Sequence, residues 1–202
     1  MKEYQNLIGK AIKDFANEIC DFLMNIPEVK SCSLYGSLSK GTYDEYSDID
    51  IAIDVSGVDN GLFITKLPEL LTKEYDIIFY DYAPSLAPEK YIISVAINTE
   101  NPFMVVDISC VANPHYDTVT KQDLARLNNQ YDHTLKLFSA NLKHHLRSAE
   151  CYDDILKMHG RIFGKDAEIY DEEQMLEAVF RWLKENAEAQ HEKYVSLLEK
   201  YM

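Results

Sequence analysis

Residues 35–54 read YGSLSKGTYDEYSDIDIAID, a pattern that predicts a turn into a helix followed by a strand. In its second half, three isoleucines alternate with acidic or small residues, which is the period of a strand with one buried face. Side chains two residues apart on a strand share a face, so Asp48 and Asp50 point the same way, with Cα atoms about 6 to 7 Å apart. Two carboxylates this close repel each other unless a cation lies between them. The ordinary alternative is a half-exposed strand with acids on its wet side, and a lone D-x-D does not exclude it.

The first half of the stretch predicts an anion site. Gly36 and Ser37 directly follow a short apolar run, and the small residues after them favour a turn into a helix. Backbone N–H groups at such a helix start, together with the Ser37 hydroxyl and the nearby Lys40, are suited to a polyphosphate. The segment therefore combines an anion cradle with a cation-binding pair, and a nucleoside triphosphate with magnesium needs both.

Three other motifs fail on inspection. Gly36 and Gly41 fit G-x-x-x-x-G, but Thr42 and Tyr43 stand where a P-loop needs Lys and then Ser or Thr. Residues 37–40 match the S-x-x-K of serine β-lactamases, yet no S-D-N or K-T-G follows. The sequence contains no G-x-G-x-x-G, which removes the dinucleotide-binding fingerprint.

A Gly-Ser pair, a ten-residue spacer and D-x-D on a strand resemble the signature of the polymerase β-like nucleotidyltransferase superfamily. The form of the motif is similar to that of small bacterial antibiotic nucleotidyltransferases and of minimal nucleotidyltransferases, and the resemblance covers about residues 30–110. It implies that Gly36, Ser37 and Lys40 bind a triphosphate. It also implies that Asp48 and Asp50 bind two divalent ions, and that a third acid on a neighbouring strand completes the site.

The third acid is predicted to be Asp107. It lies inside the apolar run PFMVVDISCV, where a carboxylate needs a partner or a metal to offset its desolvation. Asp54 shares the face of Asp50 but lies about 13 Å farther along the strand, which is too far. Asp76 and Asp81, at the two ends of DIIFYDY, stay open as alternatives, and so does the simpler reading of Asp107 as an edge-strand acid facing water.

The chain pattern predicts an α+β fold: an N-terminal mixed β-sheet with helices, the nucleotidyltransferase fold, followed by a C-terminal helical bundle. Apolar residues three and four apart predict a helix over residues 4–25. Five strands follow between residues 30 and 110, with NTENP as a hairpin loop and a short helix around Pro68. Three helical stripes follow Pro114. The expected domains are residues 1–115, for nucleotidyl transfer, and residues 116–202, for substrate binding.

The charge balance is strongly acidic. Lys and Arg number 20 against 34 Asp and Glu, a formal net charge of −14. Because phosphate backbones bind chiefly through Lys and Arg, no nucleic acid partner is expected. The N-terminus lacks a signal-peptide core and no long apolar run occurs, so we expect a cytoplasmic protein without a membrane partner.

Cysteine and histidine add no predicted site. The four cysteines form no C-x-x-C pair, which favours free thiols in a reducing compartment. The six histidines show no zinc spacing, so no zinc site is predicted. Glu150, Asp153 and Asp154 are candidates for a further acceptor-side carboxylate, but helix-start acids favoured by the dipole are the simpler interpretation.

The predicted activity is metal-dependent nucleotidyl transfer. Asp48, Asp50 and Asp107 would be the catalytic and metal-binding residues, with two Mg²⁺ ions, or Mn²⁺, and ATP or another nucleoside triphosphate as substrate. The expected acceptor is a small hydroxyl-bearing molecule such as an aminoglycoside or lincosamide, hence a role in antibiotic resistance. One alternative is a minimal-nucleotidyltransferase regulator or antitoxin that modifies a protein partner, and another is a binding protein without turnover. Whether the chain forms a homodimer stays open.

Overall fold

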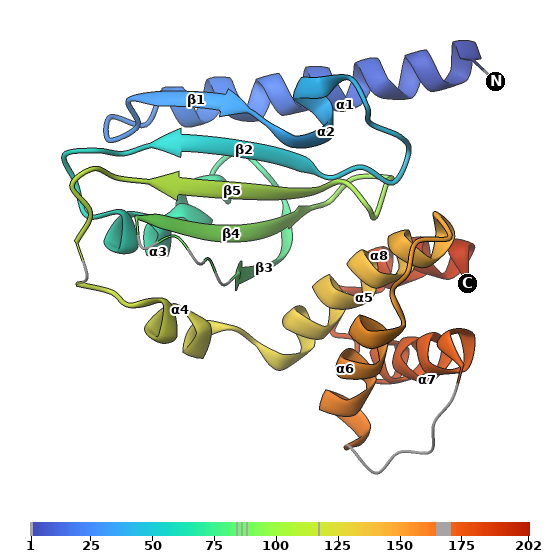
Figure 1. Ribbon diagram of the computed structural model, residues 1–202. Coiled ribbons are helices and arrows are strands. Elements are labelled where there is room, and N and C mark those ends of the chain that lie inside the picture. The colour runs from blue at the N-terminus through green and yellow to red at the C-terminus, as the bar shows by residue number, and fades with distance from the viewer. Residues whose placement is uncertain (1, 84, 86, 88, 117, 165–170) are drawn as a thin grey trace. The chain divides into compact units, whose positions relative to one another are not determined.

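A five-stranded mixed sheet forms the centre of the N-terminal part of the chain. The computed structural model describes residues 2–83, 85, 87, 89–116, 118–164 and 171–202. The strands lie in the order β1-β2-β5-β4-β3 (Figure 1). Their bounds are β1 Ser31–Leu34, β2 Ile49–Asp54, β3 Ile77–Ala83, β4 Lys90–Ile97 and β5 Val105–Val111. Strands β2 and β5 pair in parallel, whereas the other neighbouring strands pair antiparallel.

Helices cover one face of this sheet and make its apolar core. The helices of this part of the chain are α1 Lys2–Met24, α2 Gly36–Lys40, α3 Asn60–Leu71 and α4 Lys121–Leu127. Helices α1 and α3 pack on the face that carries the three isoleucines of β2, all of which are at most 1% exposed (Figure 1). The alternate residues of β2 point to the other face and are half-buried. The predicted alternation of β2 is therefore confirmed, and it directs the acids of this strand away from the core.

A second packing unit consists of helices. The described chain divides by its contacts into an N-terminal unit, Met1–Thr99 with Met104–Asn128, and a C-terminal unit, Glu100–Phe103 with Asn129–Met202. The helices of the C-terminal unit are α5 Gln130–Leu146, α6 Tyr152–Phe163, α7 Glu172–Glu185, α8 Glu192–Leu198 and the 3₁₀ helix η1 Glu199–Tyr201. Its core is built from apolar residues spaced three and four apart, among them Leu135, Phe138, Ile155, Met158, Met175, Val179 and Leu183. Tyr194 anchors the Glu100–Phe103 segment to this unit by donating its hydroxyl to the carbonyl of Pro102 at 2.5 Å.

The predicted α+β class and the five strands are confirmed, but the prediction of three C-terminal helices is wrong. The first predicted helix is divided into α4 and α5 at Asn128 and Asn129. The Asn128 side chain accepts from the N–H of Tyr82 at 2.7 Å and donates to the carbonyl of Tyr82 at 2.9 Å, so it is bound to β3. Asn129 caps α5 by accepting from the N–H groups of Tyr131 and Asp132. The last predicted helix is likewise interrupted, between α7 and α8.

Two other expectations concern the chain as a whole. The predicted division into a nucleotidyltransferase domain, residues 1–115, and a helical substrate-binding domain, residues 116–202, stays a prediction. Among the described residues, no helix is both long enough and apolar enough to cross a bilayer. The cytoplasmic location also stays a prediction.

Two leucines of α3 test how the sheet depends on its helical cover. Leu67 is fully buried in the core, whereas Leu62 is 42% exposed on the same helix. We expect Leu67→Ala to lower the free energy of unfolding by about 2 to 5 kcal/mol, because a buried leucine truncated to alanine leaves a cavity. Leu62→Ala should change it by less than about 0.5 kcal/mol. Urea-induced unfolding measures both, and equal losses would contradict the assigned packing of α3.

Candidate active site

The parallel pairing of β2 and β5 brings two of the predicted acids together. Asp50 on β2 lies directly opposite Asp107 on β5, and opposite residues of neighbouring strands point to the same face. Their backbones are separated by one strand spacing, about 4.8 Å. Because β5 lies between β2 and β4, Asp107 is not an edge-strand residue, and it is half-buried. Two carboxylates in this arrangement favour a bound cation or a shared proton.

Gly36 shapes the surroundings of the Asp50 carboxylate. Its φ of +66° suits glycine, and a Cβ built at this position would lie 1.8 Å from Asp50 Oδ2. The preceding residue, Tyr35, donates its backbone N–H to the carbonyl of Asp50 at 3.0 Å. The end of β1 is thus tied to β2 at Asp50, and the missing side chain of Gly36 leaves room for the Asp50 carboxylate.

Tyr35 lies close to all three predicted acids. Its hydroxyl is 2.8 Å from the hydroxyl of Ser109 on β5, so its side chain spans from the end of β1 across β2. Burial, together with the negative charges of Asp50, Asp107 and Asp48, raises the pKa of the Tyr35 hydroxyl. Asp48 itself lies one residue before β2 begins, rather than inside the strand as the sequence suggested. The negative charges of all three acids therefore act on the Tyr35 hydroxyl.

A serine on β4 holds the third acid. Ser94 is 4% exposed and lies opposite Asp107 in the antiparallel pairing of β4 with β5. Its hydroxyl donates to Asp107 Oδ1 at 2.5 Å, a length typical of a bond to a charged carboxylate. This bond fixes the orientation of the Asp107 carboxylate.

The two alternative acids occupy different places. Asp76 is exposed beside β3, where its Oδ2 accepts from the amide of Asn98 at 2.7 Å. Asp81 was expected at a strand end, which is wrong: it lies inside β3, is fully buried and is paired in register with Ser94. Asp50, Asp107, Ser94 and Asp81 thus form one row across four strands.

Asp54 belongs to another part of the sheet. Its Oδ1 accepts from the N–H of Ser56 at 2.7 Å, at the end of β2. Hydrogen bonds from the Ser56 hydroxyl and from the Ser56 N–H lower the pKa of the Asp54 carboxyl. Its turn-capping role agrees with leaving Asp54 out of the predicted site.

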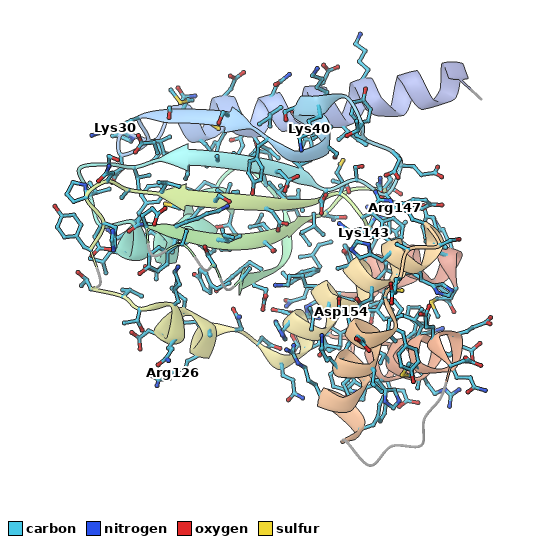
Figure 2. All side chains as sticks on the ribbon, in the orientation of Figure 1. Lys30, Lys40, Arg126, Lys143, Arg147 and Asp154 are labelled. Carbon is cyan, nitrogen blue, oxygen red and sulfur yellow. The ribbon has the colours of Figure 1, made fainter. Side chains whose placement is uncertain are left out.

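The predicted phosphate residues lie on the short helix α2. Ser37 Oγ is buried, and no hydrogen-bond partner exists for it among the described residues. Lys40 is exposed at the last residue of α2 (Figure 2). A buried hydroxyl without a partner carries a desolvation cost, which a bound ligand oxygen would offset.

Sequence reasoning missed the residues that support the acids. Tyr35 was quoted only as the start of the motif, and Ser94 and Ser109 were not considered. The signal for Ser94 was weak but present, since it stands in the strand just before the NTENP hairpin and therefore faces the strand of Asp107. Nothing local indicates that Tyr35 would reach Ser109, 74 residues away.

Residues 17–98 match the family model described as "Polymerase beta, Nucleotidyltransferase". This segment reaches from the middle of α1 to the end of β4 and contains Gly36, Ser37, Asp48 and Asp50. This segment therefore matches the nucleotidyltransferase domain of the polymerase β-like superfamily, and both the expected superfamily and the expected enzyme class are confirmed. The narrower likeness to antibiotic nucleotidyltransferases is not shown.

Several solved structures resemble the chain. One, described as "structure of GLD-2/RNP-8 complex", has a TM-score of 0.41 and 11% identity over 85% of this chain and 77% of the other. A second, "Structure of Cid1 in complex with the UTP analog UMPNPP", has a TM-score of 0.39 and 14% identity, covering 90% and 68%. A third is "Structure and function of the polymerase core of TRAMP, a RNA surveillance complex", with a TM-score of 0.34 and 11% identity, covering 97% and 55%. Among curated proteins none matches the sequence.

The expectation that excluded nucleic acid as a partner is corrected here; one of these similar structures is described as the polymerase core of an RNA surveillance complex. The physical reason is that a formal net charge of −14 is a sum over the whole chain. Contact with a phosphate backbone depends on where basic side chains gather locally, which a sum does not report. No residue role is carried over from these structures.

Two glycines of the α2 region test the contact with Asp50. Gly36 and Gly41 both have positive φ, at +66° and +70°, but a Cβ on Gly41 would meet nothing within 4 Å. Gly41→Ala should cost about 1 to 2 kcal/mol of unfolding free energy for backbone strain alone. We expect Gly36→Ala to cost about 1 to 3 kcal/mol more, because its Cβ would displace Asp50. Denaturant unfolding of the two variants gives the difference, and equal values would show that Asp50 does not occupy the space beside Gly36.

Proposed function

We propose that this chain transfers a nucleoside monophosphate from a triphosphate, with ATP as the first candidate, to a hydroxyl group of an acceptor. The observation that carries the proposal is the register of Asp50 opposite Asp107, with Asp48 two residues before Asp50 and Gly36 packed against it. In the reaction the acceptor oxygen forms a bond to the α-phosphorus. The bond from that phosphorus to the bridging oxygen breaks, and pyrophosphate leaves.

Asp48, Asp50 and Asp107 would hold the metal. Oxygen-only donors suit Mg²⁺, or Mn²⁺, and a few carboxylates combined with substrate phosphates are its usual set. The space that Gly36 leaves for Asp50 and the buried, unpartnered Ser37 hydroxyl fit a site completed by a metal–triphosphate. When bound, two such ions neutralise charge on the attacking and leaving oxygens.

The chain's own groups would bind and orient the substrates. The Ser37 hydroxyl would donate to a phosphate oxygen, and Lys40 would add positive charge beside it. Asp107, held by Ser94 at 2.5 Å, would accept the proton of the acceptor hydroxyl. Most of the rate gain would come from this positioning and from charge stabilisation.

The proposed acceptor is a small cationic molecule with free hydroxyl groups, such as an aminoglycoside or a lincosamide. Its support is local electrostatics, because the negative charges of Asp48, Asp50 and Asp107 all act at the Tyr35 hydroxyl and together would attract a cationic ligand. An RNA with a free 3′ hydroxyl is the other acceptor class, and it belongs in any test since nucleic acid is not excluded.

The proposal is tested by incubating the protein with labelled ATP and Mg²⁺ and measuring pyrophosphate. The acceptor panel holds aminoglycosides, lincosamides, an RNA oligonucleotide and the protein alone. Label on a small molecule supports the full proposal. Label on RNA retains the nucleotidyl transfer and replaces the acceptor, and label on protein indicates a regulator. No pyrophosphate with any acceptor contradicts the proposed activity.

Asp50→Asn should abolish this activity while leaving the fold intact. The amide keeps the size of the side chain but removes the charge beside Asp107, so turnover should fall at least about 10³-fold, as when a central electrostatic contact is lost. Pyrophosphate release measures turnover, and circular dichroism monitors the fold. Activity close to that of the wild type would show that Asp50 is not a metal ligand.

Ser37→Ala separates a role in binding from a role in folding. Since the Ser37 hydroxyl is buried without a partner among the described residues, its removal should leave the free energy of unfolding unchanged or slightly higher. The KM for the triphosphate should rise about 10- to 100-fold, the value of one hydrogen bond to a charged group. The matched control is Ser39→Ala, since Ser39 is exposed on the same helix and its hydroxyl donates to Gly36 O at 3.1 Å. A KM that responds equally to both changes would remove Ser37 from the phosphate site.

A further inference from the structure

Three side chains of different chemistry meet within the C-terminal unit. His145 lies in the last turn of α5, Cys151 immediately precedes α6, and Glu172 is the first residue of α7. Their ligand atoms, one imidazole nitrogen, one sulfur and one carboxylate oxygen, all lie within 4.8 Å of one another. In Figure 2 the labels of Lys143 and Arg147 mark the end of α5, and that of Asp154 marks the first turn of α6.

The turn after α5 brings Cys151 back to His145. Ser148 has a φ of +54°, which is uncommon for a residue with a side chain. Its N–H donates to the carbonyl of His145 and the N–H of Ala149 donates to that of His144, both at 2.9 Å. These bonds end α5 and reverse the chain direction. His145 and Cys151, six residues apart in sequence, therefore lie close together in space.

Two of the three separations between the ligand atoms are close to those in a tetrahedral zinc site. His145 Nδ1 lies 3.1 Å from Glu172 Oε2, and Cys151 Sγ lies 3.6 Å from the same oxygen. With Zn–N and Zn–O bonds of about 2.1 Å, Zn–S bonds of about 2.3 Å and tetrahedral angles, the N···O and S···O separations are about 3.4 and 3.6 Å. The third separation, between the nitrogen and the sulfur, is at most 4.8 Å, against about 3.6 Å in such a site, so one ion fits once the histidine shifts by about 1 Å or less.

The donor set distinguishes this cluster from the carboxylates of the sheet. Nitrogen and sulfur donors select zinc over magnesium, which prefers oxygen ligands. Cys151 is 4% exposed, whereas the side chains of His145 and Glu172 are 38% and 30% exposed. The thiol is thus protected, and solvent reaches the other two ligands and could supply a fourth.

The same contacts are also consistent with a metal-free state in which the three side chains are joined by hydrogen bonds alone. Burial first, and then the nearby Glu172, raise the pKa of the Cys151 thiol to about 11, so without a metal the thiol is neutral and can donate to Glu172. A zinc ion would replace that proton. The two states differ in whether sulfur bonds to a metal, which spectroscopy detects directly.

We propose that His145, Cys151 and Glu172 bind one zinc ion, which ties α5, α6 and α7 together. The site has no role in the proposed nucleotidyl transfer and does not depend on it. Zinc binding to folded chains adds directly to their stability, so the ion would act as a cross-link of the helical unit.

Cobalt(II) substitution tests the proposal on the full chain. The metal-free protein is titrated with Co²⁺ in excess Mg²⁺, which occupies sites made of oxygen alone. We expect one equivalent of Co²⁺ to give a thiolate-to-cobalt band in the near ultraviolet, and Zn²⁺ to remove it. No such band, or Co²⁺ bound without sulfur, overturns the proposal.

Variants assign the band to the cluster. Cys151→Ser should remove the near-ultraviolet band, and Glu172→Gln should weaken binding by more than about 10-fold, the least expected when even a supporting residue is lost. Cys20→Ser is the control, because Cys20 lies on α1 and its thiol is hydrogen-bonded to that of Cys32. A band that survives Cys151→Ser and disappears in Cys20→Ser would place the metal at Cys20 instead of Cys151 and would contradict the proposal.

A second readout covers the case in which Cys151→Ser fails to fold. The wild-type chain should unfold at a higher temperature with Zn²⁺ than with chelator, and Glu172→Gln should lose most of this difference. Glu172 is partly exposed, so its amide variant should fold. An unfolding temperature that Zn²⁺ leaves unchanged in the wild type contradicts the proposal.

Discussion

The register between β2 and β5 is the constraint on which the candidate active site depends. Both strands alternate, with isoleucine and valine on the face under α1 and α3 and with Asp50 and Asp107 on the other. A slip of one residue in either strand would move an acid into the apolar core and an isoleucine out of it. Burial of the core thus fixes the register, and the register holds two carboxylates together although they repel each other. Burial of the hydrophobic face of the same strands thus offsets the electrostatic repulsion between the two carboxylates.

This coupling explains why the strand part of the fold was predictable from the sequence. Period-two alternation identifies a strand and its buried face locally, so β2 and the unusual position of Asp107 could both be recognised. The division of the C-terminal helices could not, because Asn128 ends α4 through hydrogen bonds to Tyr82, 46 residues earlier. Apolar residues continue at helical spacing across that break. Periodicity reports which face is buried but not where a helix stops.

The candidate site, like the fold, was predictable only where a local sequence pattern reports it. The motif supplied Gly36, Ser37, Asp48 and Asp50, and desolvation favoured Asp107. Ser94 and Tyr35 depend on pairings between distant strands, which no local pattern contains. Asp81 illustrates the same limit. The desolvation argument that selected Asp107 applies equally to Asp81, which is buried in β3. The strand pairing shows that both acids lie opposite Ser94, one on each side of β4.

The cluster in the C-terminal unit shows why spacing rules miss some metal sites. Zinc motifs are recognised when two ligands lie a few residues apart on one turn. Here the ligands are separated by 6 and 21 residues and come from the end of one helix and the starts of two others. They meet because the turn at Ser148 reverses the chain and because α6 and α7 pack against α5 and each other. A histidine and a cysteine that look unrelated in sequence become neighbours through helix packing, so the helices that bury the core also determine which ligand atoms meet.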